Sequence, residues 1–212
     1  MFKKIAIGVV AVLVLFAGFV ATRPDTFTVT RSATVPGSPD IAFGLVNDFH
    51  QWSRWSPWDN VDPNLKRTFG GAESGVGATY AWTGNDDVGE GQMTIQEASA
   101  NESIRVKLEF IKPFASTSTT TFTFKPADDG TTVNWTMTGD HNLISKAMCL
   151  FMDMDKMVGK DFEKGLASMK TAAQAEVTQR AEAEAARKAA EARAAEQAAP
   201  AEGTPAVATP AP

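Results

Sequence analysis

The feature that most constrains the fold is a series of short segments in which apolar and polar residues alternate. Alternation with a period of two places apolar side chains on one face of a β-strand. The clearest segment, residues 103–111, sets four apolar residues opposite three charged ones: Ile104, Val106, Leu108 and Phe110 against Arg105, Lys107 and Glu109. Similar patterns predict strands at residues 27–35, 64–69, 76–83, 90–98, 116–125 and 131–138. Arg31 interrupts the apolar side of the first of these.

The connections between the predicted strands are short, and this constrains their relative direction. Asn85-Asp86-Asp87 and Asp128-Asp129-Gly130 have the composition of hairpin turns. Strands that follow one another through such tight turns pair in antiparallel fashion. We therefore expect one antiparallel sheet.

A second periodicity follows the strands and predicts one long helix from about Leu143 to Ala175. Apolar residues recur there at steps of three and four: Ile144, Met148, Phe151, Met154, Val158, Phe162, Leu166 and Met169. A shorter helix is expected after Ser38 and Pro39, which suit the N-cap and the first helical position. This order of elements indicates an α+β fold, in which a curved sheet wraps around the long helix and leaves a cavity between them.

A cluster of tryptophans lies between the short helix and the second strand. Trp52, Trp55 and Trp58 step by three, so a helical or 3₁₀ turn places them roughly on one side. Tryptophan buries a large apolar area but carries an N–H that needs a partner. The cluster therefore suits either a corner of the core or the wall of an apolar pocket.

The N-terminal segment contains an unbroken apolar run at residues 5–21, which spans about 25 Å as a helix. Lys3 and Lys4 precede it and predict a cytoplasmic N-terminus by the positive-inside tendency. We expect residues 1–24 to be a single-pass anchor in a bacterial inner membrane, with the globular part in the periplasm or outside the cell. A cleaved signal peptide and a buried core helix are the alternatives.

The C-terminal segment has a different composition. Residues 176–199 are rich in Ala, Glu, Arg and Lys and have high helix propensity, but they lack the apolar stripe of a coiled coil. From Pro200 onward the chain is rich in Pro and Ala, which is typical of disorder. We expect residues 176–212 to be a solvated helical extension and tail; a spacer or an envelope-interaction segment is the functional alternative.

Charge and motifs exclude several functions. The formal net charge is −5, and no dense basic patch lies beyond the extreme N-terminus, which argues against nucleic-acid binding. Cys149 is the single cysteine, so no intramolecular disulfide can form. No set of His, Cys, Asp and Glu has metal-ligand spacing, and no nucleophile elbow, phosphate loop or dinucleotide fingerprint follows a strand. We expect no metal, no cofactor and no catalytic residue.

Four segments, in order, resemble one superfamily: WSRWSPWDNVDPNLK, GVGATYAW, LEFIKPF and FMDMDKMVGKDFEKGL. They are similar to bacterial members of the START-like (SRPBCC, polyketide cyclase/dehydrase) superfamily, and the resemblance covers residues 25–175. It implies the helix-grip fold, in which a curved antiparallel sheet wraps around a long C-terminal helix. It does not fix the chemistry, because that superfamily includes lipid carriers, receptors and cyclases.

The candidate ligand-binding residues are the aromatic and methionine side chains expected on the inner faces. They are Trp52, Trp55, Trp58, Tyr80, Trp82, Met93, Phe110, Phe122, Trp135, Met148, Phe151 and Met152. Methionine adapts to irregular apolar ligands, but it also fills ordinary cores, and both readings stay open for these residues. Met157 and Phe162 are expected to contribute part of the wall on the long helix, where Gly159 and Gly165 suggest close packing.

Polar candidates are few. His50 and His141 are the only histidines, and their loop positions favour solvent exposure or helix capping over acid–base work. Arg54, within the tryptophan cluster, is expected to pair with Asp59 or to stack on an indole.

Three functions remain. The first is a membrane-tethered module that binds a small hydrophobic or amphipathic, lipid-like ligand, and it requires a real cavity. The second is an envelope structural or interaction protein of unspecified partner, and it requires exposed tryptophans. The third is a cyclase or dehydratase-like enzyme, and it requires a buried acid, base or histidine with a shifted pKa in the cavity.

Overall fold

The computed structural model of the protein describes residues 2–141, 143–150 and 153–198. Within these ranges the elements follow one another from the N-terminus to the C-terminus. They are α1 (Phe2–Ala21), β1 (Thr26–Val35), α2 (Pro39–Asn47), the 3₁₀ helix η1 (Phe49–Arg54), β2 (Lys66–Gly71), β3 (Ala78–Thr83), β4 (Glu90–Ser99), β5 (Ser103–Lys112), β6 (Ser116–Ala127), β7 (Gly130–Asp140), α3 (Leu143–Met148) and α4 (Met154–Ala198).

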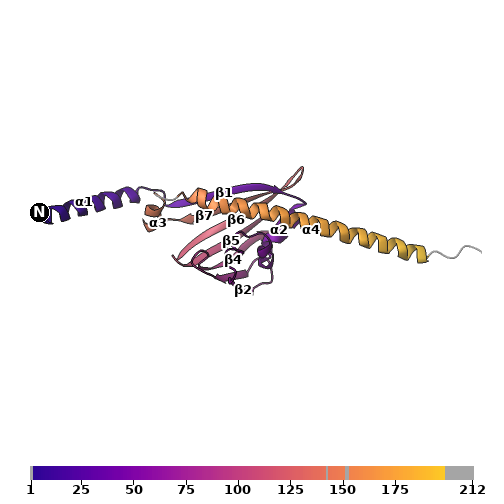
Figure 1. Ribbon diagram of the computed structural model, residues 1–212. Helices are drawn as coiled ribbons and strands as arrows, with labels where there is room; N and C mark the ends of the chain where they lie inside the picture. Colours follow the sequence, from indigo (N-terminus) through magenta and orange to yellow (C-terminus); the bar gives the residue numbers. More distant parts are fainter. Residues whose placement is uncertain (1, 142, 151–152, 199–212) are drawn as a thin grey trace, which may run out of the picture.

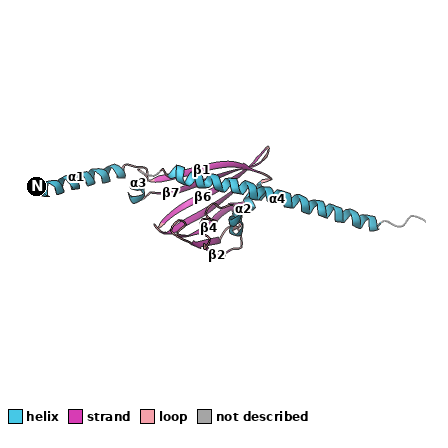
Figure 2. Cartoon of the chain, in the orientation of Figure 1, coloured by secondary structure: helices cyan, strands magenta, loops and turns pink. Residues whose placement is uncertain are grey.

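The strands form one antiparallel sheet in the order β1-β7-β6-β5-β4-β3-β2 (Figures 1 and 2). Every strand expected from the alternation is present, with small differences at the ends. From β2 to β7 consecutive strands pair with each other, and β1 pairs with β7 at one edge of the sheet. The α+β helix-grip fold predicted from the sequence is confirmed.

The first part of α4 lies across one face of the sheet and packs on β1, α2 and η1 (Figure 1). Five large side chains in this interface are almost completely buried: Trp55, Phe122, Phe162, Leu166 and Met169. They come from the residue that follows η1, from β6 and from α4, so the sheet, the tryptophan segment and the helix share one core. The period-two and period-3.6 patterns meet here, as the sequence predicted.

The expectation of one uninterrupted helix from about Leu143 to Ala175 is wrong. The structure has two helices, because Asp153 caps the start of α4: its Oδ1 accepts a hydrogen bond from the backbone N–H of Lys156 at 3.1 Å. α4 then continues to Ala198, through the segment that the sequence analysis expected to be a helical extension. Glu184 with Lys188 and Arg187 with Glu191 form ion pairs one turn apart in this extension.

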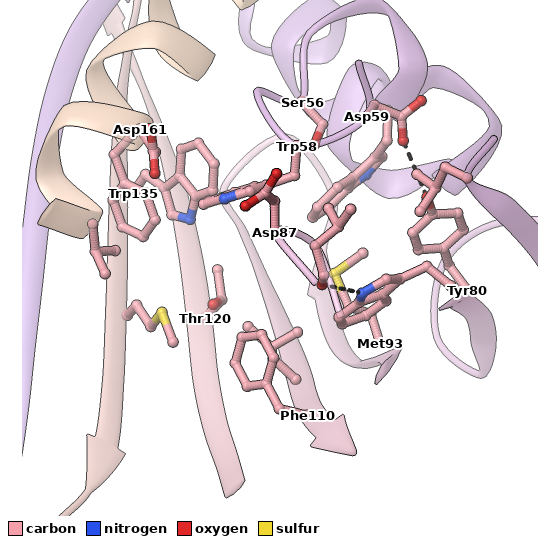
Figure 3. Close-up of a pocket in the computed structure, with 18 of the residues that line it drawn as sticks. Ser56, Trp58, Asp59, Tyr80, Asp87, Met93, Phe110, Thr120, Trp135 and Asp161 are labelled. Atoms are coloured by element: carbon pink, nitrogen blue, oxygen red, sulfur yellow. Dashed lines mark hydrogen bonds between the residues drawn. The ribbon is translucent and has the colours of Figure 1, made fainter. Parts of the chain in front are cut away.

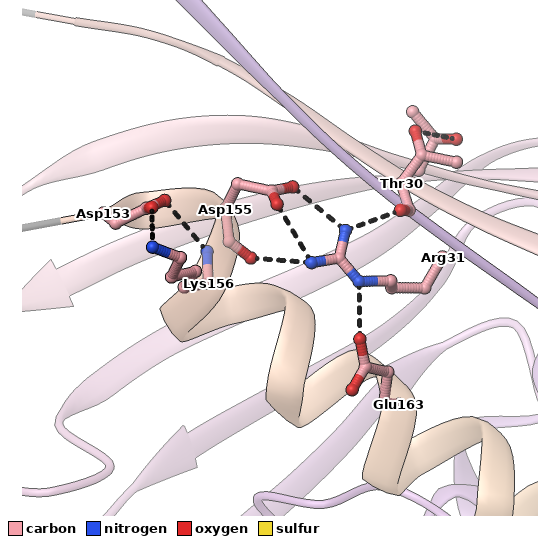
Figure 4. A network of polar contacts seen from close by, with 7 residues as sticks. Thr30, Arg31, Asp153, Asp155, Lys156 and Glu163 are labelled. Carbon is pink, nitrogen blue, oxygen red and sulfur yellow. Dashed lines mark hydrogen bonds and ion pairs between the residues drawn. The ribbon is translucent and has the colours of Figure 1, made fainter.

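Arg31, the residue that interrupted the apolar side of β1, is the centre of a polar network with α4 (Figure 4). Its guanidinium donates to both carboxylate oxygens of Asp155 at 3.0 Å and to Glu163 at 2.8 Å. A Cβ at Gly159 would lie 1.9 Å from Arg31 Nη2, so the glycine leaves the space that the guanidinium occupies. The charge of Arg31, on the apolar face of β1, is therefore compensated by carboxylates of the helix that covers this face.

Helix α1 is separate from this core. Its 20 residues span about 30 Å, and most of its side chains are exposed. By length and composition it is able to cross a membrane, although a signal sequence would satisfy the same criteria. Four residues, 22–25, join it to β1, and α1 contacts α3.

Candidate ligand-binding cavity

A cavity of about 290 Å³ lies between the sheet and α4 (Figure 3). Its walls combine one face of β3 to β7 with the tryptophan segment and the first turns of α4. The lining residues are Trp52, Ser56, Trp58, Asp59, Leu65, Tyr80, Trp82, Asp87, Val88, Met93, Leu108, Phe110, Thr120, Trp135, Met137, Met157, Val158, Asp161 and Phe162. Most are aromatic or aliphatic, which is the usual make-up of a site for an apolar ligand.

Strand alternation brings most of the sequence candidates to this space. Seven of the twelve expected residues line the cavity: Trp52, Trp58, Tyr80, Trp82, Met93, Phe110 and Trp135. Trp55 and Phe122 are buried in the core beside it, and the two rings meet edge to face at 5.9 Å. Phe151 and Met152 lie outside the described residues, and so does the side chain of Met148.

The tryptophan segment is held in place by α2. Trp52 Nε1 donates to the carbonyl of Val46 at 3.0 Å, and Trp55 Nε1 donates to the carbonyl of Leu45 at 2.8 Å. Both indoles therefore satisfy their N–H groups at the end of one helix while their rings enter the core. Both are buried, and Trp58 is half-buried against Trp135. These tryptophans therefore do not form the exposed patch that an external contact surface requires.

Trp135 is the centre of the aromatic wall. It stacks on Phe162 of α4 with ring centroids 4.0 Å apart, and it meets Trp55 and Trp58 edge to face. A Cβ at Gly165 would lie 2.7 Å from its ring, so this glycine lets α4 approach the sheet. Close packing, suggested by the glycines of the sequence, is confirmed at this position.

A buried carboxylate, Asp59, reaches the cavity wall from the loop after the tryptophans. Tyr80 donates to its Oδ1 at 3.1 Å, and Arg67 Nη2 lies 2.8 Å from its Oδ2 and donates to its backbone carbonyl at 2.7 Å. Burial, followed by the adjacent Asp59 charge, raises the pKa of Tyr80, and the Asp59 hydrogen bond raises the pKa of Arg67. Tyr80 is thus a neutral donor at neutral pH.

The expected pairing of Arg54 with Asp59 is wrong. Arg54 instead donates to Gln51 and lies near Glu176 of α4, because η1 points its side chain outward along the helix. Arg67, on the edge strand β2, pairs with Asp59 instead. No local spacing in the sequence links Asp59 with Arg67 or Tyr80, since the sheet brings them together.

Three further polar groups at the cavity have no hydrogen-bond partner among the described residues: the hydroxyls of Ser56 and Thr120 and the Nε1 of Trp135. Ser56 and Thr120 are 7% and 5% exposed. Thr120 projects into the space from β6 (Figure 3). A buried polar group without a partner costs free energy, so these groups are available to a polar atom of a ligand or to water.

The two histidines are not brought together. His50 stacks on Phe69 and bonds Asp48, while His141 lies beside Phe27 at the other end of the sheet. Neither lines the cavity. Within the described ranges no cluster of His, Cys, Asp and Glu has a geometry suited to a metal ion.

The sequence family described as polyketide cyclase / dehydrase and lipid transport matches residues 26–174. The chain belongs to this family. A search of curated proteins gives no match to the chain. The match covers the sheet and the first half of α4, and it leaves out α1 and the C-terminal extension.

Solved structures with the same fold are distant in sequence. A Mesorhizobium loti protein is 15% identical, with a TM-score of 0.51 over 69% of this chain and 96% of that one. A Staphylococcus aureus protein of unknown function is 11% identical, with a TM-score of 0.52 over 73% and 97%. The di-domain ARO/CYC StfQ of the steffimycin biosynthetic pathway is 10% identical, with a TM-score of 0.52 over 73% of this chain and 52% of StfQ.

These identities establish the fold and not the chemistry. The description of the polyketide cyclase / dehydrase and lipid transport family covers both catalysis and carriage. The cavity of this chain is mostly apolar, with a few hydroxyl, indole and carboxylate groups.

Proposed function

We propose that the chain is a membrane-tethered module that binds a small hydrophobic or amphipathic ligand in the cavity between the sheet and α4. The observation that carries the proposal is the cavity itself, with its aromatic and aliphatic walls. Its volume of about 290 Å³ is near the lower limit of roughly 300–1,000 Å³ for small-molecule sites. A single apolar chain or a small ring system suits this space better than a two-chain lipid.

The polar groups support an amphipathic ligand. The free hydroxyls of Ser56 and Thr120 lie in an otherwise apolar wall, where one hydrogen bond to a ligand oxygen fixes its orientation. Asp59 is already occupied by Tyr80 and Arg67. The neutral groups open to a ligand are therefore these hydroxyls and the Trp135 indole, while Asp87 and Asp161 add carboxylates to the lining.

Tethering rests on α1. Its apolar length suits a membrane span, and the two lysines at its start favour a cytoplasmic N-terminus. In a bacterium this arrangement places the binding domain in the periplasm or outside the cell. Thr22 to Asp25 then hold the domain directly at the membrane surface.

A catalytic role has less support. The group with a shifted pKa at the cavity is Tyr80, and its pKa is raised away from neutral pH, so it is a hydrogen-bond donor rather than a base. Neither histidine reaches the cavity. An interaction role through exposed tryptophans also loses its basis, because Trp52 and Trp55 are buried.

The test is native mass spectrometry with lipid extraction on the full-length protein, solubilised from the membranes of its own cells. We expect a stoichiometric apolar molecule in the wild type. Thr120→Phe fills the cavity from β6 and should abolish its retention, whereas Thr121→Phe, the next residue on the outer face, should retain it. An empty wild-type protein that also binds no member of a panel of lipids and isoprenoids would refute the proposal.

A further inference from the structure

One end of the sheet carries the anchor, and the strand register identifies what else lies there. β1 begins directly after α1, and its first residue pairs with the last residue of β7. The same end of the sheet can be followed from strand to strand by the residue pairs that lie there. These pairs are Thr26–Asp140, Ser118–Gly139, Phe110–Ser116, Glu90–Lys112 and Thr83–Glu90. The β5–β6 and β3–β4 connections therefore share this end of the sheet, which we call the anchor end.

The anchor end is held close to α1. Four residues join α1 to β1 and span at most about 14 Å even when fully extended. The link is also bonded to the domain: the carbonyl of Asp25 accepts from His141 N–H at 2.7 Å, and its side chain pairs with Lys146 of α3. Val20, near the end of α1, is 2% exposed. A membrane that contains α1 thus lies next to this end.

The β5–β6 tip, residues Ile111–Phe114, exposes apolar side chains at this end. Ile111 and Phe114 are 51% and 66% exposed, and Lys112 lies between them in the sequence. At the opposite end of the sheet, the β4–β5 turn (Ala100-Asn101-Glu102) and the β6–β7 turn (Asp128-Asp129) contain no large apolar residue, and the β2–β3 turn exposes one, Val76, but no aromatic ring. Aromatic and aliphatic side chains beside a lysine suit the interface of a bilayer.

The cavity also lies toward the anchor end. Trp82, Phe110 and Met137 line it from the last few residues of β3, β5 and β7, whose ends meet there. The other half of the sheet is filled by Phe124, Val133 and their neighbours in the core. The most exposed lining residues are Asp87, in the β3–β4 connection, and Met157, in the first turn of α4, so the cavity opens between these two segments.

We infer that the β5–β6 tip rests in the interface of the bilayer that holds α1, so that the cavity opens beside that bilayer and takes its ligand from the facing leaflet. The inference rests on the tether of the proposed function and adds the route by which ligand enters. It explains why apolar residues are exposed at this tip, where water alone would favour polar ones.

The test uses the full-length protein in liposomes, in a Cys149→Ser background, with a fluorescent label on single cysteines. Phe114→Cys reports the tip, Asp128→Cys is the matched control about 40 Å away along β6, and Leu13→Cys reports α1. We expect nitroxide lipids to quench residue 114 roughly fivefold more than residue 128, because interfacial side chains lie about 5–10 Å into the headgroup boundary.

The outcomes separate the inference from the proposed function. Quenching at 13 and 114 but not at 128 supports both. Quenching at residue 13 alone supports the membrane tether and overturns the inference. A label at residue 114 that is shielded from water but not quenched by the lipids also overturns the inference, and it indicates contact with a protein. No quenching at 13 refutes the tether, and the inference with it. Ligand retention in detergent is independent of orientation and tests the cavity separately.

Discussion

Tyr80 is the one tyrosine of the chain, and it ties the cavity wall to a buried charge. Asp59 is 5% exposed, which is costly for a carboxylate unless donors surround it. Tyr80 and Arg67 supply those donors from two neighbouring strands, β3 and β2. The contact therefore fixes the loop that follows the tryptophans, and with it one side of the cavity.

Because the pKa of Tyr80 is raised in the folded protein, its contribution to stability has a defined pH range. The folded form keeps the phenol proton where the unfolded chain, near a pKa of 10, loses it. The stabilisation is present below about pH 10 and is lost as the pH rises through the folded pKa. We expect the urea midpoint of the wild type to fall more steeply above pH 10 than that of Tyr80→Phe.

A spectroscopic measurement checks the same point. Tyrosinate absorbance arises from Tyr80 alone, so in the native protein it should appear only well above pH 10 and rise together with unfolding. A native protein that titrates at the ordinary pH would contradict the contact with Asp59. At neutral pH, Tyr80→Phe should lower the free energy of unfolding by about 1.5–3 kcal/mol, the usual contribution of a hydrogen bond to a charged group.

At the scale of elements, α4 approaches the sheet at two glycines that serve different neighbours. Gly159 faces the guanidinium of Arg31, and Gly165 faces the ring of Trp135 and the ring of Pro57. Trp135 is fixed between Phe162, Trp55 and Trp58, so it has little room to move. Glycine has a low helix propensity at these two positions, but it allows α4 to pack closely against its neighbours.

Gly165→Ala should therefore destabilise the domain. Its Cβ would lie 2.7 Å from Trp135 and 3.0 Å from Pro57, and overpacking of this kind costs about 1–3 kcal/mol, against a helix-propensity gain of about 1 kcal/mol. Gly44→Ala in α2 is the matched control, since nothing lies within 4 Å of its Cβ, and it should stabilise by up to about 1 kcal/mol. Thermal denaturation measures both, and equal shifts would contradict the packing argument.

The contact between β1 and α4 depends on pH through Asp155. Hydrogen bonds from Arg31 lower the pKa of Asp155 below its ordinary value of 3.8. A lowered folded pKa means that the stabilisation is present above the unfolded pKa and is lost as the pH falls through the folded one. We expect Asp155→Asn to lower the urea midpoint at pH 7, and the gap to the wild type to close on acidification below about pH 4. A gap that persists in acid would indicate lost packing instead.

The sequence predicted the elements better than the contacts between them. Strands with strict alternation, such as residues 103–111, were found almost at their expected ends, because one face of each is buried. The break between α3 and α4 was missed, because Asp153 is a cap whose neighbours continue an apolar helical pattern. The sequence did not predict the contacts of Asp59 with Arg67 and Tyr80, nor the partners of Arg31. Only the folded sheet and helix bring these residues together.

At the scale of the whole molecule, the two terminal helices leave the domain at opposite ends (Figure 1). α1 starts from the anchor end, whereas the last part of α4 projects beyond the far end. Residues 181–195 are exposed throughout, and the helix from 181 to 198 is about 27 Å long. The helix therefore extends the chain away from the anchor end of the domain.

Contacts between α4 and the core continue a little beyond residue 175, the limit that we expected for the domain. Ala172 and Ala173 are buried, Val177 packs on the core, and Arg180 pairs with Asp40 of α2. The next residues make ion pairs only along the helix itself, and exposed pairs of this kind contribute little.

A truncation series locates this boundary. A chain that ends after Arg180 should unfold within about 1 kcal/mol of the full-length protein, because it loses only exposed helix. A chain that ends after Thr171 removes Ala172, Ala173 and Val177 from the core and the Arg180–Asp40 pair. It should lose about 2–5 kcal/mol, comparable to deleting a large buried side chain. Thermal denaturation in detergent measures both; a large loss in the longer chain would mean that residues after 180 belong to the folded domain.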